Sequence, residues 1–191
     1  MAKGKLTETE RVETESRKEL MDSVPKILVY GGTALLIWLF SKLVFIKLGN
    51  AYNITSDITA GYIIAVIAIL VVLWVVLKVL KEVKDVCDAV GGLIAVNAGR
   101  GGASEEEVEN WRKAIRGVAY VIVVAVAFIF FASLLTEIGD FVGEVAAGVL
   151  LIGIFIWAAY TLYKSGMAVS KEVEARALEW EKKTLLKEAK D

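Results

Sequence analysis

Apolar and polar residues fall in long, separate blocks along this chain. Four blocks are almost entirely apolar, and they cover residues 27–46, 60–77, 117–135 and 141–163. Each is about 18–23 residues long, which is enough for an α-helix to cross a hydrocarbon core ~30 Å thick. A buried soluble core is the alternative, but it would need four long helices without a polar face. The pattern therefore predicts an all-α integral membrane protein with four transmembrane helices.

The polar stretches between these blocks divide the chain into five parts. A charged segment, 1–25, precedes a first transmembrane hairpin, 26–98, and a glycine-rich linker, 99–103, follows it. A second hairpin, 104–165, and a charged tail, 166–191, complete the chain. We therefore expect two helical hairpins in tandem, with charged segments at both termini.

The second and fourth helices are expected to continue beyond the membrane into the cytoplasm. After Leu77, apolar residues keep a helical spacing of three or four while lysines and glutamates take other positions, as far as the glycines at 99–102. Ser104 and the glutamates after it have the form of a capping box that opens the next helix. Beyond Gly166 the tail has no Pro or Gly, so the fourth helix should project by about 25 residues, or about 37 Å. The alternative for this tail is a solvated helix or coil.

Basic residues set the expected orientation of the helices. The chain has 22 lysines and arginines, and all except Lys42 and Lys47 lie on one side of the predicted spans. The positive-inside rule places that side, with both termini, in the cytoplasm of a multi-pass protein of the cell membrane. No apolar leader precedes the first span, so this span is expected to act as its own insertion signal. In the first outer loop, Asn53 begins an Asn-Ile-Thr triplet, the acceptor sequence for N-glycosylation.

The two hairpins align with each other without a gap. When Lys26 is set against Lys113, Asp57 meets Glu144 in the outer turn and both ends of the hairpins coincide. Few aligned residues are identical, so the matching boundaries carry the argument. They favour a tandem repeat whose halves are related by an axis along the membrane normal. The alternative is that any four-span protein with short turns would align in this way.

The composition removes most kinds of catalytic chemistry. The chain has no histidine and a single cysteine, Cys87, so histidine ligands for haem, zinc or copper and any cysteine cluster are missing. No glycine-rich phosphate loop follows a strand, and no ionisable residue lies near the middle of a span. Lys42 lies near the outer end of the first span and is expected to reach towards the interface. We therefore expect no enzyme, no cofactor or metal site and no nucleic-acid partner.

Small residues mark faces along which membrane helices can approach one another closely. Such faces serve packing within the four-helix unit or packing between protomers, and both remain open at this point. The positions expected to serve in helix packing are Gly31, Gly32, Gly61, Gly139, Gly143, Ala147, Gly148 and Gly153.

Three functions are compatible with these features. The first is a non-catalytic, self-associating membrane protein with a structural or scaffolding role, whose partners are membrane lipid, further copies of itself and a cytoplasmic protein bound through 166–191. The second is a passive homo-oligomeric channel with a hydrophobic constriction formed by Phe128, Phe130 and Phe131. The third is a small transporter, which the lack of a carboxylate within the spans makes the weakest of the three.

Overall fold

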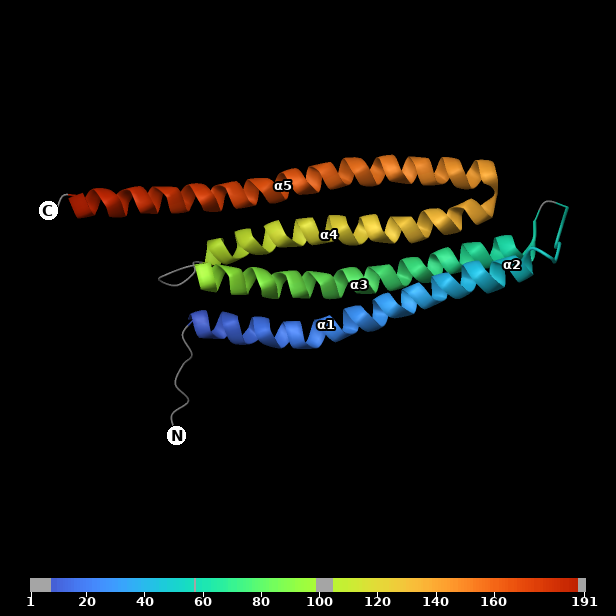
Figure 1. Ribbon diagram of the computed structural model, residues 1–191, viewed down its shortest axis with the longest axis horizontal. Coiled ribbons are helices and arrows are strands. Elements are labelled where there is room, and N and C mark those ends of the chain that lie inside the picture. Colours follow the sequence, from blue (N-terminus) through green and yellow to red (C-terminus); the bar gives the residue numbers. More distant parts are fainter. Residues whose placement is uncertain (1–7, 57, 99–104, 189–191) are drawn as a thin grey trace, which may run out of the picture.

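The computed structural model describes residues 8–56, 58–98 and 105–188 of the protein, and these residues are helical almost throughout. Figure 1 shows long helices, each antiparallel to the one before it in the chain. They are α1 (Glu8–Phe40), α3 (Ala60–Ala98), α4 (Glu105–Leu135) and α5 (Asp140–Glu188). The π-helix η1 (Ser41–Phe45) and α2 (Ile46–Gly49) continue α1, and the 3₁₀ turn η2 (Thr136–Ile138) continues α4. Within these ranges, four helices are long and apolar enough to cross a membrane, which confirms the predicted all-α class and supports the four predicted spans.

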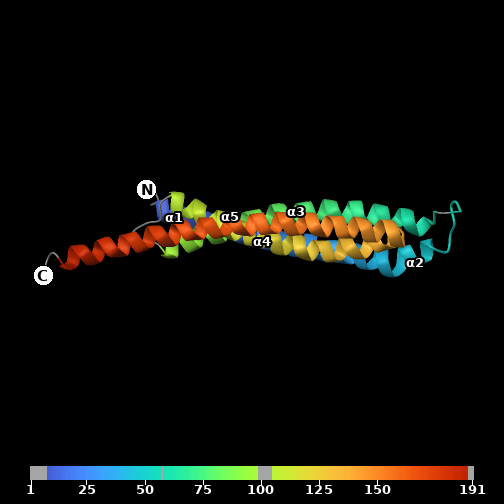
Figure 2. The ribbon, with the colours of Figure 1, turned by 90° about the horizontal axis from the view of Figure 1, so that it is seen from above.

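The four long helices lie in one layer. α3 packs between α1 and α4, and α5 packs mainly on α4. α1 and α5 therefore form the two edges of the layer (Figure 1), and the view turned by 90° shows the helices overlapping in a narrow band (Figure 2). A closed four-helix bundle would instead bring its first and last helices together. We call the end with the two short connections the turn end, and the opposite end the charged end.

The buried core is small and lies towards the turn end. Its cluster consists of Ile46, Ala65, Ala68, Val72 and Leu134. Small side chains on α3 allow the neighbouring helices to approach, while most large apolar side chains of the layer point outwards. In the most apolar window of α5 no residue is buried. This arrangement suits a bilayer, where apolar surface faces lipid tails without the cost that water would impose.

The charged segment at the N-terminus is helical and continuous with the first span, which the sequence pattern did not predict. α1 begins at Glu8 and passes through Pro25 without ending. Proline removes one backbone hydrogen bond and kinks a helix, and Figure 1 shows α1 changing direction near its middle. Pro25 is exposed, as is Met21, whose carbonyl loses its partner, so water can solvate that carbonyl. Ion pairs one turn apart support this stretch, such as Arg17 with Glu13 at 2.9 Å.

The second and fourth helices continue past their apolar blocks, as predicted. α3 ends at Ala98, next to the expected glycine stop, and α5 reaches Glu188. The cytoplasmic placement of these extensions and the tandem repeat stay predictions. The linker at 99–103, the cap at Ser104 and the aligned Asp57 lie outside the described residues.

Candidate functional site

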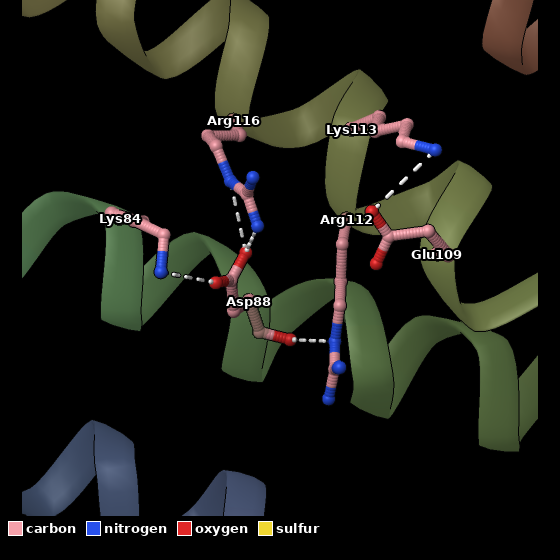
Figure 3. A network of polar contacts seen from close by, with 6 residues as sticks. All are labelled: Lys84, Asp88, Glu109, Arg112, Lys113 and Arg116. Carbon is pink, nitrogen blue, oxygen red and sulfur yellow. Dashed lines mark hydrogen bonds and ion pairs between the residues drawn. The ribbon is translucent and has the colours of Figure 1, made fainter. Parts of the chain in front are cut away.

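The main polar network joins α3 to α4 near the charged end and is centred on Asp88 (Figure 3). Arg116 donates hydrogen bonds to one Asp88 carboxylate oxygen, from Nε at 3.1 Å and also from a terminal nitrogen. Lys84 Nζ lies 3.5 Å from the other carboxylate oxygen. Arg112 Nε donates to the Asp88 backbone carbonyl at 3.0 Å. Asp88 therefore connects three cations from two helices.

The central ion pair of this network is largely buried. Only 16% of the Asp88 side chain and 27% of the Arg116 side chain are exposed, so water screens their attraction less than it screens a surface pair. The Lys113–Glu109 pair in the same view runs along α4 at 3.5 Å and is about half exposed. We expect the Asp88–Arg116 pair to hold the helices together, and the Lys113–Glu109 pair to add little.

Close approach of the helices surrounds the network. A Cβ placed on Gly91 would lie 2.8 Å from the Arg112 backbone, and one placed on Gly92 would lie 2.8 Å from the Ser16 hydroxyl. Ser16 is 1% exposed, and its hydroxyl has no hydrogen-bond partner within the described part of the chain. Arg112 also interacts electrostatically with Glu19 of α1. Three helices therefore meet at Gly91 and Gly92.

A second polar cluster lies at the turn end and contains Lys42. Lys42 is part of the π-helix η1, and its ammonium group donates to the Ser133 carbonyl at 3.1 Å and to the Ser133 hydroxyl. The same Nζ lies 3.7 Å from a carboxylate oxygen of Glu137 in η2. About 31% of the Lys42 side chain is exposed. Lys42 therefore links the first hairpin to the second at the turn end of the molecule. Its position in the sequence did not indicate this role.

The phenylalanines proposed as a constriction have different surroundings. Phe130 meets Trp38 of α1 in an edge-to-face contact, with ring centroids 5.1 Å apart. Phe131 packs against the core cluster, and Phe128 is half-buried. Two of the three rings therefore fill contacts between helices of one chain. A constriction between copies of the chain stays a prediction.

The small residues expected to serve in packing fall into four groups. A Cβ at Gly61 would meet the Asn50 side chain and, at 2.7 Å, the Ile46 carbonyl, and one at Gly143 would meet the end of α4. Gly139 has a φ of 123°, which glycine adopts easily, and it forms the turn before α5. Ala147 is half-buried. The remaining four have no atom of the described residues within 4 Å of the place that a Cβ would take, and they face open space: Gly31, Gly32, Gly148 and Gly153.

Two close contacts at glycine, besides those at Gly91 and Gly92, were missed in the sequence. A Cβ at Gly49 would lie 2.6 Å from the Gly61 backbone nitrogen, and one at Gly117 would meet the Ser165 side chain. Gly49 lies in α2 and Gly117 in α4, so these contacts join α2 to α3 and α4 to α5. Glycine alone does not reveal such a contact, because the facing helix must also be known.

Two hydroxyl side chains of the spanning helices, Thr33 and Ser165, bond to their own helices. Thr33 donates to the Val29 carbonyl at 2.7 Å, and Ser165 donates to the Thr161 carbonyl at 2.9 Å. These bonds satisfy hydroxyl groups without a partner helix, which lipid surroundings require. Asn53 of the glycosylation triplet is exposed in the first connection, where its backbone forms a bridge with Thr59.

Within the described ranges, no group of three His, Cys, Asp or Glu side chains is placed to hold a metal ion. The arrangement therefore offers two interhelical polar clusters and broad apolar faces as its candidate functional features. Comparison with protein-family models, with curated proteins and with solved structures finds no match for this chain.

Proposed function

We propose that this protein is a non-catalytic structural component of the cell membrane that self-associates through α5 and acts as a scaffold. The observation that carries the proposal is the open edge of the helix layer. Among the described helices, α5 packs mainly on α4, and its most apolar window contains no buried residue. An edge helix of this kind can accept a further helix without any change in the fold.

The side chains of α5 support an interaction at this edge. Gly143, Ser165 and Ala168 are buried, and the contact of Ser165 with Gly117 shows that this stripe faces α4. Ile152 and Ile156 lie away from that stripe, and each is 63% exposed. Gly148, with open space beside it, would allow a second helix to come close.

The long extension of α5 supports the scaffolding part of the proposal. Beyond its apolar block, α5 stays helical to Glu188 and exposes Val173 and Leu178. A helix of this kind offers an apolar surface to a protein at the membrane, as in helix-in-groove recognition. With the predicted orientation, this partner is cytoplasmic.

Co-purification from membranes tests the self-association. Two copies of the chain with different affinity tags are expressed together, extracted with a lipid-retaining polymer and captured through one tag. We expect the second tag to be captured, and we expect Gly148→Leu to reduce that capture by filling the open space on α5. Gly31→Leu is the matched control, because Gly31 is also helical and open but lies on α1. The proposal would be overturned if the second tag is not captured with the first. It would also be overturned if Gly31→Leu reduces that capture and Gly148→Leu does not.

A further inference from the structure

One face of α3 changes from apolar to basic at the boundary of the membrane. Ile67, Leu70 and Trp74 are each more than half exposed, and Lys78 and Lys81 follow them, also exposed. The steps of three or four residues place these side chains on one side of the helix. The apolar block 60–77 ends immediately before Lys78. We call this the Trp74–Lys81 face. It has an apolar part within the block 60–77 and a basic part, Lys78 and Lys81, beyond the end of that block.

The two lysines of this face have no carboxylate partner in the part of the chain that the structure describes, unlike other lysines nearby. Lys78 Nζ lies 5.6 Å from the centre of the Trp74 ring, a cation–π contact. No ion pair within the described residues involves Lys78 or Lys81, although Asp85 lies one turn after Lys81. By contrast, Lys26 is paired with Asp22 at 2.6 Å, and Lys84 with Asp88. The Trp74–Lys81 face thus carries two cations that remain available to an anion.

The neighbouring helices close this face towards the charged end. Gly92 lies eighteen residues after Trp74, which is five turns at 3.6 residues per turn, so both point to the same side of α3. At Gly92 that side is covered by Val12 and Ser16 of α1 and by Arg112 of α4. At Trp74 the same side is open, with 61% of the residue exposed. The exposed part of this face therefore begins at Lys81 and continues along α3 towards the turn end, through Trp74 to Ile67.

We propose that the Trp74–Lys81 face binds an anionic phospholipid. The acyl chains would lie along Ile67 and Leu70, the Trp74 ring would sit at the level of the headgroup, and Lys78 and Lys81 would bind the phosphate. Tryptophan favours this depth in a bilayer, and lysines at the membrane surface attract anionic lipids. A zwitterionic headgroup would place its own cation near the two lysines, so the face favours a lipid with net negative charge. A soluble anion would leave the apolar part of the face unused.

Lipid binding to the purified full chain tests this proposal. Native mass spectrometry in detergent would count bound phosphatidylglycerol and, separately, bound phosphatidylcholine with the same acyl chains. We expect the wild-type chain to prefer phosphatidylglycerol. Each lysine near a membrane surface raises the affinity for anionic lipid about fivefold. The double variant Lys78→Gln with Lys81→Gln should therefore weaken phosphatidylglycerol binding about 25-fold. Glycerophosphoglycerol, the headgroup without acyl chains, should not displace the lipid.

The matched control is Lys18→Gln with Lys47→Gln, which removes the same charge from two other exposed lysines. It should leave the lipid preference unchanged. An equal loss of phosphatidylglycerol binding in both double variants would show that the lipid responds only to the net charge of the protein, and it would overturn the site. An unchanged lipid preference in Lys78→Gln/Lys81→Gln would also overturn it. Displacement by glycerophosphoglycerol would assign the lysines to a soluble anion instead. Circular dichroism and gel filtration confirm that each variant is folded.

Discussion

Glycine residues have two distinct roles in this molecule, and their surroundings distinguish them. At Gly49, Gly61 and Gly91 a backbone or a neighbouring side chain occupies the place of a Cβ. At Gly148 and Gly153 no atom of the described chain lies within 4 Å of that place. Substitutions should therefore have opposite effects on the stability of the single chain at the two kinds of site, because one kind fixes a helix crossing within the chain and the other lies on its open surface.

Gly91→Ala should destabilise the protein. The new methyl group would lie 2.8 Å from the Arg112 backbone, which cannot rotate away as a side chain can. Overpacking of this kind typically costs about 1–3 kcal/mol, and the melting temperature of the purified protein in detergent would report it. Gly153→Ala is the control and should keep or slightly raise the melting temperature, because alanine suits a helix better than glycine. Equal melting temperatures for Gly91→Ala and the wild type would mean that α3 and α4 do not cross at Gly91.

At the scale of elements, the sequence pattern predicted α3 and α5 well because no strong break interrupts either helix. It missed the helical form of residues 8–25, because a charged stretch ending in Pro25 has no apolar period to follow. The ion pairs one turn apart, such as Lys26 with Asp22, are a signal that was present in the sequence. The π-helix η1 has no comparable signal, and its residue Lys42 bonds to Ser133, a residue far away in the chain.

The connection between α3 and α4 should depend on Asp88 more than on neighbouring acids. Asp88→Asn would remove the carboxylate that accepts from Arg116, in a site where 16% of the side chain is exposed. We expect a loss of about 1.5–3 kcal/mol in the free energy of unfolding, the usual value of hydrogen bonds to charged groups. Unfolding in mixed micelles with increasing denaturing detergent would measure it. Glu109→Gln should cost less than about 1 kcal/mol, since its pair with Lys113 is exposed. Similar losses in both variants would contradict this assignment.

The Lys42 cluster should couple the two hairpins at the turn end. In a double-mutant cycle, Lys42→Met and Glu137→Gln should show a coupling of about 0.5–1 kcal/mol, because their charged groups lie 3.7 Å apart and are part-buried. The same unfolding assay measures each single and double variant. Lys47→Met with Glu137→Gln is the control cycle and should be additive, since Lys47 is exposed and has no ion pair within the described residues. Additive effects at Lys42 would mean that the pair does not form in the membrane.

At the scale of the whole molecule, charge should determine which side of the membrane each end occupies. The chain has one cysteine, so Cys87→Ala provides a cysteine-free background for labelling. In intact cells, a membrane-impermeant maleimide should label Asn53→Cys and should not label Val173→Cys. After the cells are opened, both should react. Labelling of Val173→Cys in intact cells would reverse the predicted orientation.

The single helix layer is the feature on which the proposed self-association depends, and no sequence pattern indicated it. Apolar periodicity shows that a helix crosses the membrane, but four fully apolar spans fit a closed bundle and an open layer equally well. The arrangement is decided by contacts such as Gly117 with Ser165, which place α5 on α4 and leave the opposite side of α5 free.

The distance between the two edge helices is the most direct test. Nitroxide labels on Leu36→Cys of α1 and Ile152→Cys of α5, in the Cys87→Ala background, lie near the middle of their apolar blocks and are exposed. Neighbouring helices lie about 8–10 Å apart. Pulsed electron spin resonance in lipid nanodiscs, with unlabelled protein in excess, should therefore give a separation of about 20–30 Å across the intervening helices. A main population near ~10 Å, the spacing of adjacent helices, would mean that the bundle is closed and that α5 has no open edge.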